Sequence, residues 1–411
     1  MLNLRLLKLS DALLWIAIAV LISIGLLAIF SSTGSMQLKL GIDPWMYIKR
    51  QFISLLVGIA GLALFCYLDY KHFKKAAPYF FGVMLLGLII ILFVGSGSQG
   101  AQRWFQLGFF SFQPSEISKI IMAICLAGFF SERKKLGTLD ALTLLGLVGL
   151  PFILIFKQPD LGTALVFVVI LVGMLSASRS SPKLLALLVT PMLSMLFRPI
   201  LILWLIYLLT LGLILFLRRS SFMDWLLIFG VNIGVGLAMP LIWGVLKVYQ
   251  RERILSFLNP ASDPYGAGYH SLQSMIAIGS GGFFGKGFLH GTQTQLQFIP
   301  EQHSDFIFSA IGEEFGFIGA IIVICLFAVV IWRGLKIAAE SIDNFGSLLA
   351  SGIVVMTAFH VFANIGMTLG LLPVVGIPLP FISYGGSSLL MNLISIGILQ
   401  SIAMRRQKII F

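Results

Sequence analysis

Long apolar runs separated by short polar breaks dominate this chain from one end to the other. Most runs are about as long as a helix that crosses the hydrocarbon core of a bilayer. Their composition does not alternate as the strands of a membrane barrel do. The pattern therefore predicts an all-α, polytopic helical membrane protein, in which helices satisfy the backbone polar groups. The expected spans lie near residues 11–31, 51–68, 78–95, 115–131, 140–156, 161–177, 184–197, 199–217, 222–246, 305–332, 346–370 and 384–403.

Composition and charge add an orientation to this pattern. Of the 411 residues, 58% are apolar and 11% are charged, whereas soluble domains carry about 25% charged residues. When the polar breaks are placed on alternating sides, most Lys and Arg residues fall on one side, in short runs such as 71–75, 133–135 and 405–408. The positive-inside rule makes that side cytoplasmic, with both termini inside. A single membrane domain over residues 1–411 is expected, with a long extracytoplasmic loop at 247–304.

The two spans between residues 183 and 219 are the least regular. Both apolar runs are short, and they meet at a turn that contains Arg198 and Pro199. This pattern fits either two crossings or a re-entrant hairpin in the interface. Either arrangement leaves the sides of the other spans unchanged.

The outer loop contains LNPASDPYGAGYHSLQ, residues 258–273, in which one carboxylate lies between two prolines. Pro260 and Pro264 disfavour helix at the residues before them, so Asp263 is expected on a loop. An Asp-Pro turn is common, and its spacing alone does not make the aspartate catalytic. Three basic residues come shortly before it, at Lys247, Arg251 and Arg253. They fit either anchoring to headgroups or neutralisation of an anionic, lipid-linked substrate.

The residues after this turn predict a short amphipathic helix in the membrane interface. His270, Gln273 and Ser274 fall on one face at helical spacing, with apolar residues opposite. The following GSGGFFGKG has backbone donors and Lys286 that could hold phosphate oxygens. It does not fit the Walker pattern of nucleotide-binding loops, which needs a glycine and a hydroxyl residue where this chain has Ser280 and Gly287.

The next polar cluster, PEQHSDF, is compatible with two interpretations. Glu301, His303 and Asp305 are residue types that bind a divalent cation. Such a cluster at the start of a helix also caps the helix and forms hydrogen bonds.

Several other polar residues lie within or beside the apolar runs. Arg103 precedes a span that carries Glu116 and Lys119 three residues apart. These two side chains either neutralise each other or face a functional cavity, because ionisable groups in a span are costly. Asp160 is either a helix N-cap or a site residue. Two serines near the last span, Ser383 and Ser387, belong to a set of small residues that is typical of close helix packing.

Six motifs in this order resemble the SEDS family (shape, elongation, division and sporulation) of membrane glycosyltransferases. They are GAQRW, QPSEISK, QPDLGTAL, DPYGAGYHSLQS, LHGTQTQLQFIPEQHSDFIFSAIGEEFG and PVVGIPLPFISYGGSS. The resemblance covers residues 12–176 and 222–404, and it is stronger to the elongation branch than to the division branch. It implies a ten-helix core, to which residues 183–219 would add an inserted hydrophobic hairpin.

The resemblance also implies an activity and a partner. Members of the family polymerise lipid II into peptidoglycan at the outer face of the bacterial cytoplasmic membrane, beside a class B penicillin-binding transpeptidase. The essential loop aspartate of the family corresponds to Asp263, which would act as general base on the GlcNAc 4-hydroxyl, with inversion at the MurNAc carbon. Arg103, Lys119 and Lys286, with or without Mg²⁺ or Mn²⁺, would bind the pyrophosphate. The remaining candidates for substrate binding are Glu116, Asp160, Gln273, Ser274, His303, Ser383 and Ser387.

Two other classes of function fit parts of the sequence. A lipid II flippase or other transporter would explain many helices with buried charges, but no internal repeat of the kind found in transporters is visible. A structural scaffold for a transpeptidase would explain exposed helix faces, yet it would not need Asp263.

Overall fold

The computed structural model describes residues 8–39, 41–95, 103–107, 110–133, 136, 138–178, 182–219, 221–258, 268–299 and 301–406. Each of the twelve expected spans coincides with a helix. These helices are α2 (Ala12–Lys39), α3 (Met46–Tyr67), α4 (Lys71–Val94), α5 (Pro114–Ser131), α6 (Thr138–Lys157), α7 (Leu161–Ala177), α8 (Pro182–Phe197), α9 (Leu201–Leu217), α10 (Phe222–Val245), α14 (Ile307–Ala339), α15 (Asn344–Thr368) and α16 (Gly386–Met404). The outer loop adds α11 (Val248–Leu258), α12 (Tyr269–Ser280) and α13 (Thr292–Gln295).

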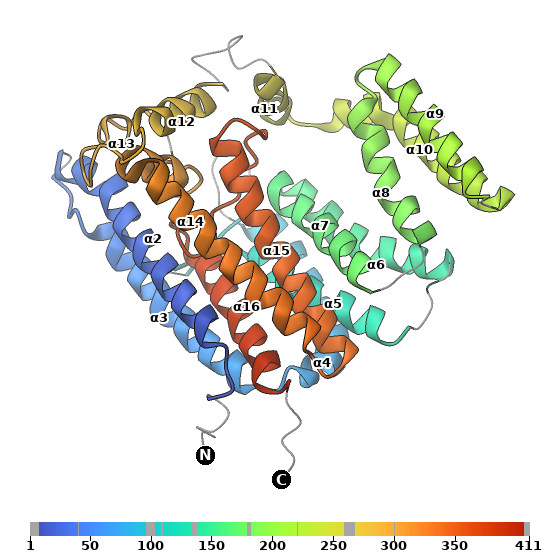
Figure 1. Cartoon of the computed structure of the whole chain (residues 1–411), viewed down its shortest axis with the longest axis horizontal. Coiled ribbons are helices and arrows are strands. Elements are labelled where there is room, and N and C mark those ends of the chain that lie inside the picture. Colours follow the sequence, from blue (N-terminus) through green and yellow to red (C-terminus); the bar gives the residue numbers. More distant parts are fainter. Residues whose placement is uncertain are drawn as a thin grey trace.

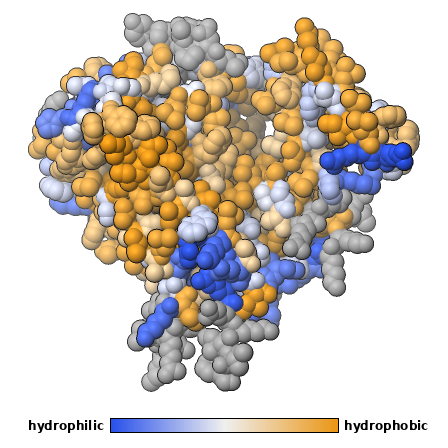
Figure 2. All heavy atoms as spheres, in the orientation of Figure 1, coloured by the Kyte–Doolittle hydropathy of each residue, from blue (hydrophilic) through white to orange (hydrophobic). Residues whose placement is uncertain are grey.

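The described helices have the length and surface of a membrane-embedded bundle. Nine of them are long and apolar enough to cross a bilayer, and α7, α8 and α9 are shorter apolar helices. Figure 2 shows a face that is mostly hydrophobic across its middle, with hydrophilic residues gathered towards its lower end and margins. The protein is therefore a multi-pass membrane protein, as predicted, and α12 forms where an amphipathic helix was expected.

A polar contact ties the first and last long helices together at one end of the bundle. The backbone N–H of Asp11 donates to Oε1 of Gln400 at 2.8 Å, and the Arg333 guanidinium donates to the buried Asp11 carboxylate. The start of α2 and the end of α16 thus lie on the same side, opposite α11, α12 and α13 (Figure 1). Within the bundle, α16 is almost entirely buried and packs along α3.

The helices α8, α9 and α10 form a separate lobe beside the bundle, the α8–α10 lobe (Figure 1). It has its own small apolar cluster around Leu211, Leu215 and Ile228. It also buries a polar network, in which Nδ2 of Asn232 donates to Oγ1 of Thr190 at 2.8 Å and to its own helix at Ile228 O. This network links α8 to α10, so the segment predicted as an inserted hairpin packs closely on a helix of the expected core.

The glycine-rich segment after α12 packs against a break in α14. Gly316 has φ +65°, a left-handed conformation that favours glycine, and it interrupts the helix. The segment supplies hydrogen bonds there, since the N–H of Lys286 donates to the carbonyl oxygen of Glu313 at 3.0 Å. A Cβ on Gly285 would lie 2.1 Å from the carbonyl oxygen of Glu314, so only glycine fits. These glycines therefore serve a close backbone approach.

A two-stranded antiparallel hairpin before α5 was not anticipated from the sequence. Its strands are β1 (Phe105–Leu107) and β2 (Phe110–Phe112), with Phe105 opposite Phe112. The hairpin is held to the last helix, because the N–H of Gln113 donates to Oγ of Ser387, which in turn donates to Ser111 O. The fold is otherwise helical, so the predicted all-α class is confirmed.

Candidate active site

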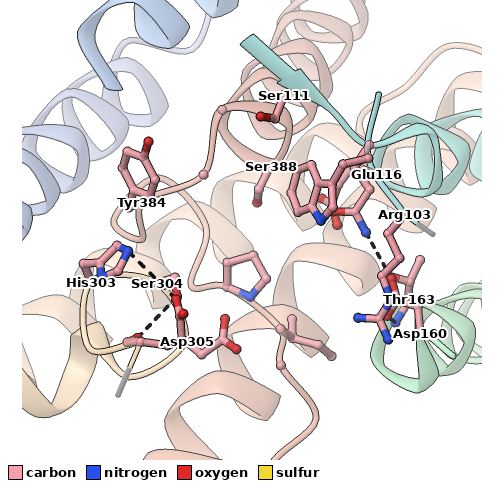
Figure 3. A pocket seen from close by; sticks show the side chains of 18 of the residues that line it. Arg103, Ser111, Glu116, Asp160, Thr163, His303, Ser304, Asp305, Tyr384 and Ser388 are labelled. Atoms are coloured by element: carbon pink, nitrogen blue, oxygen red, sulfur yellow. Dashed lines mark hydrogen bonds and ion pairs between the residues drawn. The ribbon is translucent and has the colours of Figure 1, made fainter. Parts of the chain in front are cut away.

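A polar cavity of about 730 Å³ lies where the hairpin, α5, α7, α11 and the start of α16 meet the segment before α14. Figure 3 shows its two walls: Arg103, Glu116, Asp160 and Thr163 on one side, and His303, Ser304 and Asp305 on the other. Both α11 and the segment before α14 belong to the outer loop. The cavity therefore lies at the end of the bundle that was predicted to face outwards.

Asp160 helps to form one wall and caps α7 as well. Its Oδ1 accepts from the backbone N–H of Thr163 at 3.1 Å, as an N-cap does. Its Oδ2 accepts from Oγ1 of Thr163 and from Nε2 of Gln113, at 3.0 and 3.1 Å. Asp160 is therefore the N-cap of α7, and it also lines the cavity. Arg103 is fixed beside it, with Nε donating to Gln158 O at 2.8 Å.

Glu116 and Lys119 form a buried ion pair on α5 that also lines the cavity. Nζ of Lys119 donates to Oε1 of Glu116 at 2.7 Å and to Nε2 of His360 on α15 at 3.0 Å. Oε2 of Glu116 is buried and has no hydrogen-bond partner among the described residues. A buried carboxylate oxygen without a donor is costly, so this ion pair keeps unused hydrogen-bonding capacity beside the cavity.

The opposite wall carries Glu301, His303 and Asp305. Burial, together with the nearby charge of Glu301, raises the pKa of Asp305 to about 6. Burial also lowers the pKa of His303, whose ring packs against Tyr47 and Tyr384. At neutral pH this wall therefore holds a neutral imidazole and a carboxyl group that titrates unusually close to neutrality.

The structure adds lining residues that sequence reasoning did not select. Arg50 comes from α3 and Tyr249 from α11, beside Arg253, for which the sequence left substrate neutralisation open. The hydroxyl of Tyr249 donates to Pro159 O at 2.9 Å, which holds α11 over the cavity. The lining thus combines four basic side chains, Arg50, Arg103, Lys119 and Arg253, with four acidic ones, Glu116, Asp160, Glu301 and Asp305.

Asp263 lies in segment 259–267, outside the described residues. The helices on both sides of this segment contact the cavity or its wall. Tyr249 and Arg253 of α11 line the cavity, and the ring of His270 in α12 stacks on Phe306, next to Asp305.

The other predicted site residues do not line the cavity. Lys286 donates through Nζ to Oε1 of Glu313 at 2.8 Å and to Thr292. Ser274 joins α12 to α15 by donating to Thr368 O, and Ser383 donates to Ser304 O, each at 2.6 Å. Two further candidates, Gln273 and Ser387, are also absent from the lining.

Glu301, His303 and Asp305 all line the cavity, and Nε2 of His303 is 3.9 Å from Oε2 of Glu301. Within the described ranges, no group of three His, Cys, Asp or Glu side chains has the arrangement of a metal site. Metal binding therefore stays a prediction without a described ligand set.

The comparisons with known proteins agree with one another. Residues 11–211 and 179–408 match the sequence model of the FtsW, RodA and SpoVE family, described as "Cell cycle protein". The second range includes the whole of the 183–219 hairpin, which was expected to lie outside the resemblance. The chain is 37% identical to "Peptidoglycan glycosyltransferase MrdB" of Escherichia coli K12, over 87% of this chain and 86% of the relative. It is 33% identical to "Stage V sporulation protein E" of Bacillus subtilis, over 96% of both chains.

Solved structures show the same fold. A chain from the study "Structural coordination of polymerization and crosslinking by a peptidoglycan synthase complex" superposes with a TM-score of 0.72 at 26% identity, covering 97% of this chain and 99% of that one. The rod shape determining protein RodA of Thermus thermophilus has a TM-score of 0.64 at 24% identity, over 97% and 98% of the two chains. The chain therefore belongs to the SEDS family of FtsW, RodA and SpoVE proteins, as its motifs predicted.

Proposed function

We propose that this chain polymerises lipid II into glycan strands at the outer face of the bacterial inner membrane, for cell elongation and rod shape. Its relatives include proteins named peptidoglycan glycosyltransferase, at 37% and 35% identity, so the chain is a peptidoglycan glycosyltransferase. The observation that carries the choice of substrate is the cavity at the predicted outer end of the bundle, which combines basic residues with Oε2 of Glu116, an acceptor without a partner among the described residues.

The chemistry of the cavity suits a sugar that leaves as a pyrophosphate. Glycosyl transfer builds positive charge at the donor anomeric carbon while the leaving group gains negative charge. A pyrophosphate is a good leaving group, so it needs cations more than a proton donor. Arg103 and Lys119 provide positive charge in the lining, and Arg50 and Arg253 add to it. Lys286 is engaged by Glu313 and is no longer needed for this role.

Asp263 is proposed as the general base that removes the proton of the attacking GlcNAc 4-hydroxyl, with inversion at the MurNAc carbon. Support comes from the contacts of its flanking helices with the cavity, through Tyr249 and Arg253 of α11 and through His270 of α12. A base on the outer loop would meet a lipid-tethered substrate at the membrane interface. Glu116, Asp160 and His303 would contact the sugars or the pyrophosphate.

Orientation and partner are part of the same proposal. The basic polar segments between the spans predict that both termini are cytoplasmic. The contact between Asp11 and Gln400 supports this orientation, because it brings the start of α2 and the end of α16 to one side of the bundle. The structural neighbour comes from a peptidoglycan synthase complex, which supports a class B penicillin-binding transpeptidase as partner. We derive no catalytic step through Mg²⁺ or Mn²⁺, because the described residues hold no ligand set for it.

The direct test is a polymerisation assay with purified full-length protein and labelled lipid II. Glycan strands that a muramidase digests, formed without any other glycosyltransferase, are the expected result. The same preparation in vesicles is tested for movement of lipid II between leaflets. Movement without polymerisation would identify a flippase, and the absence of both with partner transpeptidase present would favour a scaffold.

A further inference from the structure

A buried histidine, His360, contacts the ammonium of Lys119 from α15. His360 lies in the middle of α15 and is fully buried. Its Nδ1 is 2.7 Å from the carbonyl oxygen of Met356, and its Nε2 is 3.0 Å from Nζ of Lys119. Because a carbonyl oxygen only accepts, Nδ1 carries the proton. Because an ammonium only donates, Nε2 presents its lone pair. These two partners assign a neutral imidazole with one defined tautomer.

His360 competes with Glu116 for the N–H groups of Lys119. An ammonium has three donors, and Lys119 uses one for Oε1 of Glu116 and one for His360. Oε2 of Glu116 has no partner in the described part of the chain, although Lys119 is only one helical turn away. An ammonium without the imidazole would gain by turning towards this second oxygen, because a buried carboxylate strongly favours paired oxygens.

The neutral imidazole also preserves the charge of the pair. A second carboxylate at the same place would hold Lys119 equally well, but it would leave the site with a net negative charge. The uncharged ring orients the ammonium without neutralising its positive charge. The charge of Lys119 can therefore still attract an anion in the cavity. Among the contacts of the described residues, the pair Glu116 and Lys119 then keeps one acceptor and one donor unused.

We propose that His360 is a positioning residue that holds the Lys119 ammonium in an open ion pair, so that one N–H of Lys119 binds a phosphate oxygen of the substrate and Oε2 of Glu116 accepts from a substrate hydroxyl or amide. The proposal rests on the proposed function, because the phosphate belongs to lipid II. His360 itself does not line the cavity and acts through Lys119.

Two amide substitutions of different length at His360 distinguish a role in positioning Lys119 from a role in packing. In His360→Gln the side-chain oxygen can reach Lys119 as Nε2 does. In His360→Asn the amide can still donate to Met356 O but is too short for Lys119. The control is Thr357→Val, one turn earlier on α15, because this buried hydroxyl donates only within its helix, to Ile353 O at 2.9 Å.

KM for lipid II is the informative readout, since partial misfolding reduces the amount of active enzyme and leaves KM unchanged. We expect His360→Asn to raise KM about 10-fold or more, as for loss of one charge-assisted hydrogen bond. His360→Gln should stay within about threefold of the parent, and Thr357→Val should match it. Equal KM values for the Asn and Gln variants, or loss of the folded protein in both, would overturn the proposal.

Substitutions of His360 in a protein that lacks Lys119 show whether their effect on lipid II binding depends on Lys119. In Glu116→Gln/Lys119→Met protein, binding of labelled lipid II should be equally weak with His, Gln or Asn at position 360. A difference between Gln and Asn that persists there would reject the proposal while leaving the proposed function intact. A parental protein that forms no glycan and binds no lipid II would instead reject the proposed function itself.

Discussion

The cavity and the α8–α10 lobe both bury polar side chains among apolar helices, but they use them differently. In the lobe, Asn232 donates to Thr190 and to Ile228 O, while its own Oδ1 accepts from Tyr207 at 2.8 Å. In the cavity, among the described residues, Oε2 of Glu116 has no partner and Lys119 has a donor to spare. A saturated network indicates a structural role, whereas unused capacity beside a cavity indicates a ligand.

The same contrast explains why burial alone does not identify a functional residue. Ser194 in the lobe is as deeply buried as any cavity residue, yet its hydroxyl donates to Asn232 O and accepts from Nε1 of Trp204. All of these partners come from α8, α9 and α10. The network thus specifies how three apolar helices pack, which apolar contacts alone specify poorly.

The largest expected effect comes from removing both charges of the cavity pair. Glu116→Gln/Lys119→Met should reduce lipid II polymerisation about 100-fold or more, because it removes the acceptor and the cation together. Its thermal stability in detergent should equal or exceed that of the parent, since replacing a buried ion pair by neutral groups is often neutral or stabilising. Loss of stability with normal activity per folded molecule would assign the pair to structure instead.

The matching change in the α8–α10 lobe should lower stability and leave polymerisation nearly unchanged. Asn232→Leu removes one hydrogen-bond partner each from Thr190 and Tyr207, whose hydroxyls still donate to Ala186 O and Thr190 O. We therefore expect a loss of about 1 kcal/mol in stability. Polymerisation per folded molecule should stay within about twofold of the parent, because the network does not reach the cavity. Thermal unfolding and turnover, both normalised to folded protein, measure the two quantities. Strong loss of turnover in a stable Asn232→Leu protein would remove the distinction between the regions.

The smallest expected effect is a pH-dependent gain in stability at Asp305. A carboxyl group whose pKa is raised on folding destabilises the folded state as pH rises through its ordinary pKa, and the penalty is complete above the raised value of about 6. Asp305→Asn should therefore raise the melting temperature at about pH 7.5 and change it little at about pH 4. A gain of the same size at both values would mean that the carboxyl group is not the cause.

The sequence predicted the helices of the fold better than the contacts between them. Apolar runs located the helices because a span needs a long apolar stretch regardless of its neighbours. The ten-helix resemblance and the amphipathic α12 followed from motifs and periodicity. The hairpin of β1 and β2 was missed because two short strands leave a weaker signal than a span.

The composition of the site depended on contacts that a single sequence does not encode. Arg50 and Tyr249 line the cavity from helices whose facing sides cannot be read from periodicity alone. Lys286 looked like a phosphate ligand because its partner, Glu313, is distant in the sequence. His360 did carry a usable signal, since an ionisable residue within a span indicates a functional site by default.

The outer loop is proposed to supply the general base for glycosyl transfer in the cavity, and Asp263→Asn tests this proposal most directly. This change keeps size and removes the charge, so turnover of lipid II should fall about 10²- to 10⁴-fold. The matched control is Asp43→Asn, a second Asp-Pro turn on the predicted outer face, where the carboxylate accepts from the N–H of Trp45 at 2.9 Å. Asp43→Asn should polymerise lipid II like the parent, and both variants should insert normally. Polymerisation by Asp263→Asn at the parental rate would show that Asp263 is not the general base.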